Sequence, residues 1–306
     1  MSDAHAFSSP MKADSDRPAP KTALVILNPT AGSAKGERLA KALAVLAEGD
    51  CRVEIRPTGA RGDAETFARQ AAGLGEFRAV IAAGGDGTIN EVVNGLAGSS
   101  MPLGLLPMGT ANVLASELGI ADPQAAAKAI VNGKTRTIHL GRCGGRYFTM
   151  MAGVGFDARV VAGIRTAEKR RLGKLAYVLQ SGRELFARPS PRLEVMLDGT
   201  AEIASSVIIA NGHYYAGRYV VAPEASLNRP ELIACRFTRG DKFGILRAAA
   251  FLGMGIMPHL PDLSRKPVSR IELNEPAGEP VQADGDIVAH IPCVIEAGVA
   301  TVTVLA

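Results

Sequence analysis

The chain has 306 residues, of which 47% are hydrophobic, enough for a large buried core divided between two domains. A formal net charge of +4 suits an anionic substrate or membrane surface, but it is too small to indicate nucleic-acid binding. The four cysteines form no C-x-x-C pair and the histidines do not cluster with them, so neither a disulfide framework nor a zinc site is expected.

Residues 1–20 mix Ser, Asp, Pro and Lys, and we expect them to form a disordered tail. They contain no apolar core of signal-peptide length, and no later apolar stretch is long enough to span a bilayer. A cytoplasmic protein is therefore expected.

From residue 21 onward, strand and helix patterns alternate, which favours a doubly wound, Rossmann-like α/β domain with a mostly parallel sheet. Three of the strands are apolar runs that end in a turn of small residues. In order, the expected elements are strand Ala23–Leu27, helix Lys35–Ala47, strand Val53–Arg56, a helix carrying Ala64 to Ala71, strand Ala79–Ala83, strand Leu103–Leu106, helix Val113–Leu118, and a helix starting at Asp122-Pro123 and stopping at Gly133.

The run Ala79–Ala83 ends in Gly84-Gly85-Asp86-Gly87-Thr88, just before a helix. Glycines leave backbone N–H groups open to a phosphate chain at the mouth of that helix. Asp86 would be repelled by phosphates unless a cation lay between them, so it is interpreted as a Mg²⁺ or proton-handling residue. A simple tight turn is the alternative, and Thr88 to Glu91 also fits a helix capping box.

Two similar turns follow other strands: one begins at Asn28-Pro29, and the other runs from Pro107 through Gly109 to Asn112. Because parallel strands end at one edge of a sheet, the three turns are expected to converge on one polar phosphate pocket.

Together these turns resemble, in order and spacing, the motifs of the diacylglycerol kinase catalytic family, which includes bacterial lipid kinases and sphingosine and ceramide kinases. The resemblance, which runs from about residue 21 to the C-terminus, implies ATP- and Mg²⁺-dependent phosphate transfer to a lipid hydroxyl. It also implies a nucleotide domain followed by a β-sandwich. The implied ATP-binding residues are Asn28, Pro29, Gly32, Gly84, Gly85, Gly87, Thr88, Glu91, Gly109, Thr110 and Asn112.

From Thr135 onward short strand-like runs predict an antiparallel second domain, so the domains are placed at 21–134 and 135–306. Asp198-Gly199 is a strong hairpin signal. The expected strands are Thr135–Leu140, Arg146–Met151, Arg192–Leu197, Ile203–Ala210, Glu231–Phe237, Val268–Leu273 and Thr301–Leu305.

Two acidic segments of this domain match family motifs. Asp157, after Gly155-Phe156, resembles an acid that contacts the lipid head group in sphingosine kinases, with a helix N-cap as the alternative. Asp284 opens an Asp-Gly-Asp motif whose first acid is proposed in the family as the base for the lipid hydroxyl. Asp286 is a candidate metal ligand, and Asp86 remains a rival base.

Two further segments suit a membrane surface. Residues 165–188 carry seven Lys or Arg on an amphipathic helical pattern, and residues 243–260 are rich in large apolar side chains. Packing on a sheet with a solvated face, or in the core, is the alternative. We expect peripheral association with an anionic bilayer at its inner face, and a homodimer is left open.

The chain departs from many bacterial diacylglycerol kinases at Val113, where they have an acid, and at residues 225–230, which lack their Asp-Gly. A structural Mg²⁺ in the second domain is therefore doubtful, and ceramide or a sphingoid base rivals diacylglycerol as the acceptor. A NAD kinase, which shares the Gly-Gly-Asp-Gly turn, and a silent nucleotide- or lipid-binding module are the alternatives.

Overall fold

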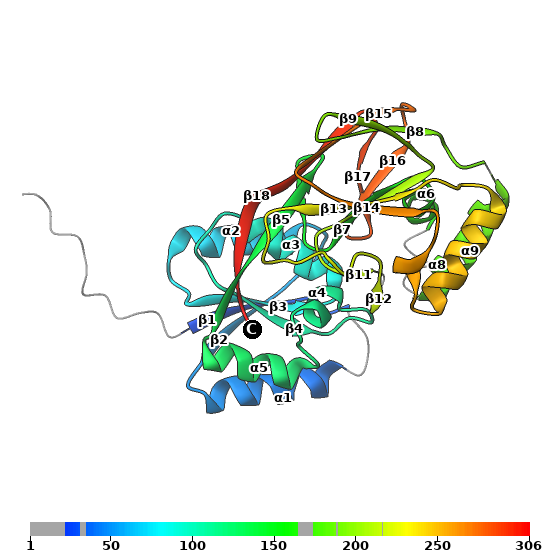
Figure 1. Ribbon diagram of the computed structural model, residues 1–306. Coiled ribbons are helices and arrows are strands. Elements are labelled where there is room, and N and C mark those ends of the chain that lie inside the picture. The colour runs from blue at the N-terminus through cyan, green and yellow to red at the C-terminus, as the bar shows by residue number, and fades with distance from the viewer. Residues whose placement is uncertain (1–21, 31–34, 165–173, 188, 216) are drawn as a thin grey trace, which may run out of the picture.

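The computed structural model describes residues 22–30, 35–164, 174–187, 189–215 and 217–306 (Figure 1). Gly32 and the basic residues Lys169, Arg170 and Arg171 lie outside these ranges, as does the side chain of Lys174. The elements of the first half are β1 (Thr22–Leu27), α1 (Lys35–Glu48), β2 (Arg52–Pro57), α2 (Asp63–Leu74), β3 (Ala79–Gly84), α3 (Asp86–Leu96), β4 (Leu103–Pro107), α4 (Val113–Glu117) and α5 (Pro123–Asn132).

The first half forms the predicted doubly wound sheet. Its strands run in the order β2-β1-β3-β4 and all pair in parallel. Helices α1 and α5 pack together on one face, while α2 and α3 pack together on the other (Figure 1). Because both faces are covered, β3 and β4 are buried throughout, as their uninterrupted apolar runs predict.

Helix α5 begins and ends at the residues that the sequence indicates. The Asp122 carboxylate accepts hydrogen bonds from the backbone N–H groups of Gln124 and Ala125, and Pro123 occupies the first turn. Gly133 ends the helix with φ +68, a left-handed conformation that glycine adopts without strain.

The second half is mainly antiparallel, which confirms the predicted α/β domain followed by a β-sandwich-like domain. One sheet has the order β14-β13-β10-β7-β16-β17, and strands β18, β15, β8 and β9, with β5 and β6, extend the first sheet. The remaining elements are β5 (Thr135–Cys143), β6 (Arg146–Phe148), β7 (Met151–Val154), α6 (Phe156–Gly163), α8 (Lys174–Ala187), β8 (Leu193–Leu197), β9 (Thr200–Ala204), β10 (Ser206–Ala210), β11 (Tyr214–Tyr215), β12 (Tyr219–Val220), β13 (Leu232–Phe237), α9 (Lys242–Gly253), a 3₁₀ turn (Met257–His259), β14 (Leu263–Val268), β15 (Arg270–Glu275), β16 (Pro280–Ala283), β17 (Asp286–His290) and β18 (Cys293–Leu305).

Strand β18 joins the two halves. Its first part pairs with β15, and near its end Val304 pairs in parallel with Leu103 of β4. Strand β5 runs beside it in antiparallel register over most of its length. The parallel sheet of the first half is therefore completed by the last strand of the chain (Figure 1).

Several strands differ from the prediction where backbone geometry interrupts an apolar run. The segment Arg146–Met151 is divided between β6 and β7, and Ile203–Ala210 between β9 and β10. The segment Val268–Leu273 spans the break at Ser269 between β14 and β15. The Asp198-Gly199 hairpin is confirmed, with φ +46 and +81 at these residues.

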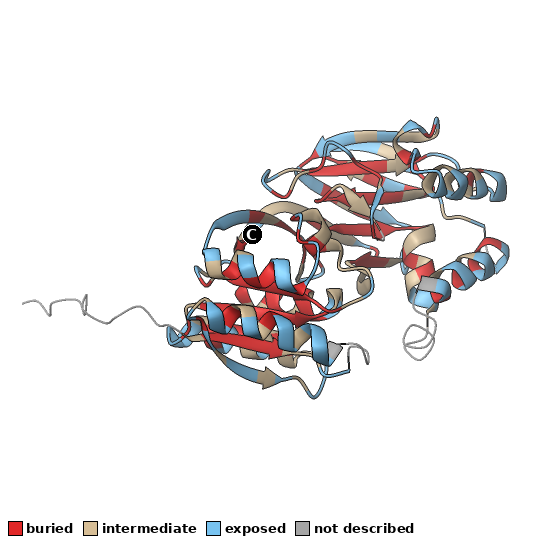
Figure 2. Ribbon diagram, turned by 90° about the horizontal axis from the view of Figure 1, so that it is seen from below, coloured by how far each residue is buried: buried red, intermediate tan, exposed pale blue. Residues whose placement is uncertain are grey.

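The buried residues form a large cluster, which fills the space between the parallel sheet and its helices and continues into the second half, and a smaller one within the second half (Figure 2). Helices α8 and α9 lie side by side at the end of the molecule remote from α1 and α5 (Figure 1). Among the described residues, no helix is long and apolar enough to cross a membrane.

Candidate functional site

The first two glycine-containing turns meet where the strand order reverses. After β1 the chain adds β2 on one side, and β3 then pairs on the other side of β1. Asn28 follows β1 and Thr88 follows β3, and the Asn28 side-chain amide donates a hydrogen bond of 3.0 Å to the Thr88 hydroxyl. Crevices at such reversal points are the usual ligand sites of open α/β sheets.

The third turn packs directly on the second through two glycines. A Cβ built on Gly85 would lie 3.3 Å from Gly109 Cα, and one on Gly109 would lie 2.7 Å from Gly85 Cα. Gly85 has φ −90, so its requirement is space and not a left-handed backbone. Asn112 fixes the third turn by bonding the N–H and carbonyl of Gly109 at 2.8 and 2.9 Å.

Asp86 has a structural position that its motif did not reveal. Its carboxylate accepts hydrogen bonds from the backbone N–H groups of Asn112 at 3.0 Å and Val113 at 2.7 Å. These are the open donors at the start of α4, so Asp86 caps a helix that follows a different strand. The capping box expected at Thr88 and Glu91 is wrong, because α3 begins at Asp86 after Gly85.

A cavity of about 590 Å³ opens beside these turns. Five of the predicted site residues line it: Asn28, Gly87, Thr88, Glu91 and Asp286. Its described lining residues do not include five others that were predicted: Gly85, Asp86, Gly109, Thr110 and Asn112. Gly85, Asp86, Gly109 and Asn112 instead shape the second and third turns. This volume is in the range of small-molecule sites.

The loop between β2 and α2 and the start of α2 also form part of the site, which the motifs did not predict. Thr58, Arg61 and Glu65 line the cavity from this side, together with Gly59, Ala60 and Gly62. A signal was present, since Thr58-Gly59-Ala60-Arg61-Gly62 is another glycine-containing turn between a strand and a helix. An acid, Asp63, follows this turn directly, and its carboxylate accepts hydrogen bonds from the backbone N–H groups of Gly59 and Ala60, both at 2.7 Å.

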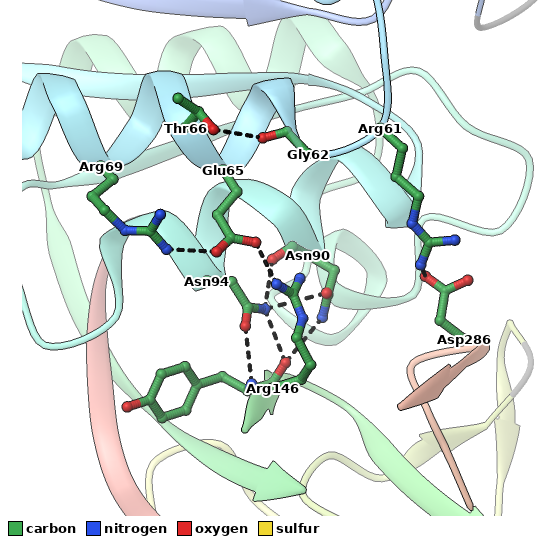
Figure 3. Close-up of polar contacts among 10 residues, drawn as sticks. Arg61, Gly62, Glu65, Thr66, Arg69, Asn90, Asn94, Arg146 and Asp286 are labelled. Atoms are coloured by element: carbon green, nitrogen blue, oxygen red, sulfur yellow. Dashed lines mark hydrogen bonds and ion pairs between the residues drawn. The ribbon is translucent and has the colours of Figure 1, made fainter. Parts of the chain in front are cut away.

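The second half contributes Arg146, the first residue of β6, to the same wall. Its guanidinium is ion-paired with Glu65 on α2, which also bonds Arg69 at 2.5 Å (Figure 3). Burial acts to raise the pKa of Glu65, but the bonds from the two arginines prevail and lower it. Asn94 on α3 pairs with the backbone N–H and carbonyl of Tyr147 at 2.9 and 3.0 Å. The cavity wall is thus held together across both halves.

Asp284 occupies the first position of a tight turn between β16 and β17. It has φ +47 and is followed by Gly285 at φ +84, a hairpin geometry that Asp-Gly favours. The acid that the family resemblance implies as the base therefore lies in the turn of a β-hairpin.

The Asp284 carboxylate is surrounded by donors. Three backbone N–H groups, one hydroxyl and one amide donate to it: Thr149 N at 2.7 Å, Met150 N at 3.0 Å, Met151 N at 3.1 Å, Thr149 Oγ1 at 2.9 Å and Asn90 Nδ2 at 3.0 Å. Burial raises the pKa of Asp284 against the opposing effect of these hydrogen bonds. Since Asn90 lines the cavity, the acid lies directly behind the cavity wall.

Asp157 lies in the first turn of α6, whose N-cap is Gly155, so the N-cap alternative for Asp157 is wrong. Its carboxylate accepts hydrogen bonds from the Tyr215 hydroxyl at 2.5 Å and the Gln282 amide at 2.7 Å. Burial raises the pKa of Asp157 and holds that of Tyr215 well above its usual value. Gln282 also accepts from Gly285 N–H at 2.9 Å, which links this cluster to the turn of Asp284.

The predicted metal ligands differ in their freedom to bind a cation. Both Asp86 oxygens accept backbone N–H groups, whereas Asp286 lines the cavity and pairs with Arg61 at 3.0 Å. Within the described ranges, no three His, Cys, Asp or Glu side chains are grouped so that they could hold a metal ion. The residues fit a Mg²⁺ that is held mainly by bound phosphates, with Asp286 or Glu91 as a protein ligand.

Comparison with known proteins agrees with this geometry. Residues 22–143 match the diacylglycerol kinase catalytic domain, and residues 150–306 match the YegS C-terminal NAD kinase beta sandwich-like domain. A diacylglycerol kinase of Bacillus subtilis (strain 168) is 37% identical over 68% of this chain and 71% of its own length. A Pseudomonas putida protein named "Probable lipid kinase YegS-like" is 30% identical over 82% of this chain and 86% of its own.

Among solved structures, a diacylglycerol kinase from Bacillus anthracis str. Sterne superposes with a TM-score of 0.76 and 26% identity. The match covers 94% of this chain and 98% of that one, so both halves are arranged alike. By its two matched domains and the shared fold, the chain belongs to the diacylglycerol kinase family of lipid kinases.

Proposed function

We propose that this protein transfers the γ-phosphate of ATP to a hydroxyl group of a membrane lipid. The observation that carries the proposal is the cavity at the reversal point of the sheet, whose wall residue Asn90 bonds the Asp284 carboxylate at 3.0 Å. A phosphate chain lying on Gly87 and Thr88 at the start of α3 would have its terminal group close to that acid. Phosphate transfer depends mainly on such positioning and on charge neutralisation, which Mg²⁺ supplies when bound with ATP.

Asp284 is the better base of the two candidates. Asp86 is occupied by the N–H groups that start α4 and is not among the described residues that line the cavity. The Asp284 carboxylate accepts hydrogen bonds from five donors, so an alcohol can bond to it only if one of these donors moves away. The Thr149 hydroxyl is the natural one, because it can rotate away without any change of backbone.

Helices α8 and α9 would bring this site to a bilayer. They and the residues just after α9 expose eight large apolar side chains: Leu175, Val178, Leu179, Phe186, Phe243, Leu246, Met254 and Ile256. Cations lie among them, since Lys242 Nζ is 4.8 Å from the Phe186 ring centre and Arg239 is 5.4 Å from that of Phe243. Apolar side chains with cations at their edge suit an anionic membrane interface.

The names of the relatives favour diacylglycerol as the acceptor. A head group with an amide or amine can bond Asp157 only if Tyr215 or Gln282 releases one of its oxygens, because Asp157 is not among the described lining residues of either cavity. A buried carboxylate can accept a hydrogen bond from such a group, which a glycerol ester lacks. If the acceptor is ceramide or a sphingoid base, Asp157→Asn should lower turnover of that lipid far more than turnover of diacylglycerol.

The test is a competition assay. Equimolar diacylglycerol, ceramide and sphingosine in mixed micelles are incubated with labelled ATP and Mg²⁺, with NAD as a separate acceptor, and the products are separated by chromatography. A labelled lipid supports the proposal and identifies the acceptor. Labelled NADP, or no labelled product, would contradict it and favour the NAD kinase or the silent binding module.

Asp284→Asn should reduce turnover by roughly 10²-fold or more, the usual scale for loss of a general base. Asp198→Asn is the matched control, because Asp198 occupies the same kind of Asp-Gly turn with φ +46 and bonds the backbone N–H groups of Ser269 and Arg270. Asp198 is not among the described residues of the cavity wall. Equal activity of the two variants would remove Asp284 from the mechanism.

A further inference from the structure

A second, smaller cavity of about 170 Å³ adjoins the first. The two share four lining residues, and the smaller one continues along the second half of the chain past Ala283 and Ile287. The shared residues, which mark the junction of the cavities, are Arg61, Asn90, Arg146 and Asp286.

Two arginines flank this junction from opposite halves of the molecule. Arg61 comes from the loop between β2 and α2, and Arg146 begins β6 (Figure 3). The third shared residue, Asn90, is the one that bonds Asp284. Two guanidinium groups therefore flank the junction of the cavities, and the proposed base lies behind it, bonded to Asn90.

We propose that Arg61 and Arg146 clamp the phosphoryl group that is being transferred, an inference that rests on the proposed function. If ATP fills the larger cavity and the acceptor hydroxyl approaches Asp284, the γ-phosphate has to lie at the junction. Fixed cations at that point stabilise the charge that spreads over the phosphoryl oxygens during transfer. Guanidinium groups suit this task because they bind phosphate oxygens through paired N–H donors.

Both arginines keep donors for a phosphate. Arg61 pairs with Asp286 at 3.0 Å through one nitrogen, and Arg146 pairs with Glu65 through one nitrogen, whereas each guanidinium has five N–H groups. The Arg61 side chain is 77% exposed and that of Asp286 41%, so this ion pair is weak and a phosphate can displace it. If Arg61 turned to the phosphate, Asp286 would lose this ion pair and would be available to hold a Mg²⁺ bound with ATP.

A purely structural role is the competing explanation, because each ion pair also joins the two halves. The experiment measures the affinities of ATP and AMP by calorimetry for Arg61→Gln, Arg146→Gln and Arg146→Lys. Removing one charge-assisted contact to the terminal phosphates should weaken ATP binding by roughly 10-fold or more and leave AMP within about 2-fold. Arg146→Lys keeps the charge and should fall between Arg146→Gln and wild type.

Two controls separate the explanations. Arg69→Gln removes an arginine that bonds the same Glu65 at 2.5 Å but is not among the described residues of either cavity wall, so it should keep the wild-type ratio of ATP to AMP affinity. Asn94→Ala breaks a contact between the halves, at Tyr147, while retaining both arginines, and it should keep that ratio too. Thermal unfolding of each variant reports any loss of structure independently.

The outcomes distinguish the two proposals. If wild type binds ATP and the Arg61 and Arg146 variants keep its ATP to AMP ratio, the clamp is wrong and the arginines only join the halves. The same conclusion follows if Asn94→Ala loses the ratio as fully as Arg146→Gln does. If wild type binds no ATP, both the clamp and the proposed function are wrong.

Discussion

A methyl group added at Gly87 should have opposite effects on the stability of the protein and on its affinity for ATP. It lies on α3 and lines the cavity, and a Cβ built on it meets no atom within 4 Å. Alanine is favoured over glycine inside a helix by roughly 0.5–1 kcal/mol, so Gly87→Ala should raise the free energy of unfolding by that amount. The methyl group would nevertheless occupy the space that the phosphates need, so we expect ATP affinity to fall by roughly 10-fold.

Gly73→Ala on α2 is the matched control, because its Cβ also meets no atom within 4 Å and Gly73 is not among the described lining residues. It should gain similar stability in a denaturant titration and bind ATP as wild type does. Equal ATP affinities of the two variants would show that phosphates do not approach α3 at Gly87.

The pH dependence of turnover should report the environment of Asp284. Burial raises the pKa of this carboxyl, and only its deprotonated form can accept a proton. As the pH falls through that raised pKa, kcat/KM, which reports the free enzyme, should decline at a higher pH than for an ordinary exposed aspartate. Thr149→Val removes a hydroxyl bond of 2.9 Å to the anion and should move the decline to still higher pH. A decline that is unmoved in Thr149→Val would contradict this assignment.

At the scale of elements, α8 and α9 carry the apolar surface proposed to contact the membrane. Phe186 is 73% exposed and Phe243 61% exposed, so replacing both by serine should change stability little. Loss of their burial in the interface should lower binding to anionic vesicles by roughly 10-fold or more, since a fully buried aromatic side chain contributes about 1.5–3 kcal/mol. Vesicle sedimentation measures this effect.

Leu74→Ser on α2, an equally exposed apolar residue at 59%, is the control and should sediment as wild type does. Indifference of sedimentation to the double replacement would assign the helices a purely structural role. The basic segment at Lys169, Arg170 and Arg171 remains a prediction, because it lies outside the described residues.

For the whole molecule, β18 is the element that makes the two halves one unit. It pairs with β15 in the second half and reaches β4 in the first, where Val304 is fully buried. Val304→Ala should therefore lower the free energy of unfolding by about 2 kcal/mol. Because both halves share this strand, calorimetry should show a single unfolding transition that moves as a whole. Two transitions, of which only one moves, would show that the halves unfold independently.

Local patterns determined the first half and its turns. Apolar runs that end in glycine turns predicted the parallel strands, Asp122 and Gly133 predicted the ends of α5, and Asp198-Gly199 predicted a hairpin. These features depend on backbone conformation and on neighbours a few residues away, so short stretches of sequence contain the information they need. The family motifs extended this reading to Asp157 and Asp284.

Only the tertiary structure decided what these side chains contact. Asp86 caps a helix 27 residues later, Asp284 is held by donors up to 194 residues away, and Arg61 and Arg146 line the same cavity because a loop of one half faces a strand of the other. Such contacts depend on how sheets and helices pack, and no periodicity along the chain encodes them. The sequence could therefore indicate which residues carry the chemistry. Only the fold showed which of them line the cavity, which cap a helix and which are held in place by hydrogen bonds behind the wall.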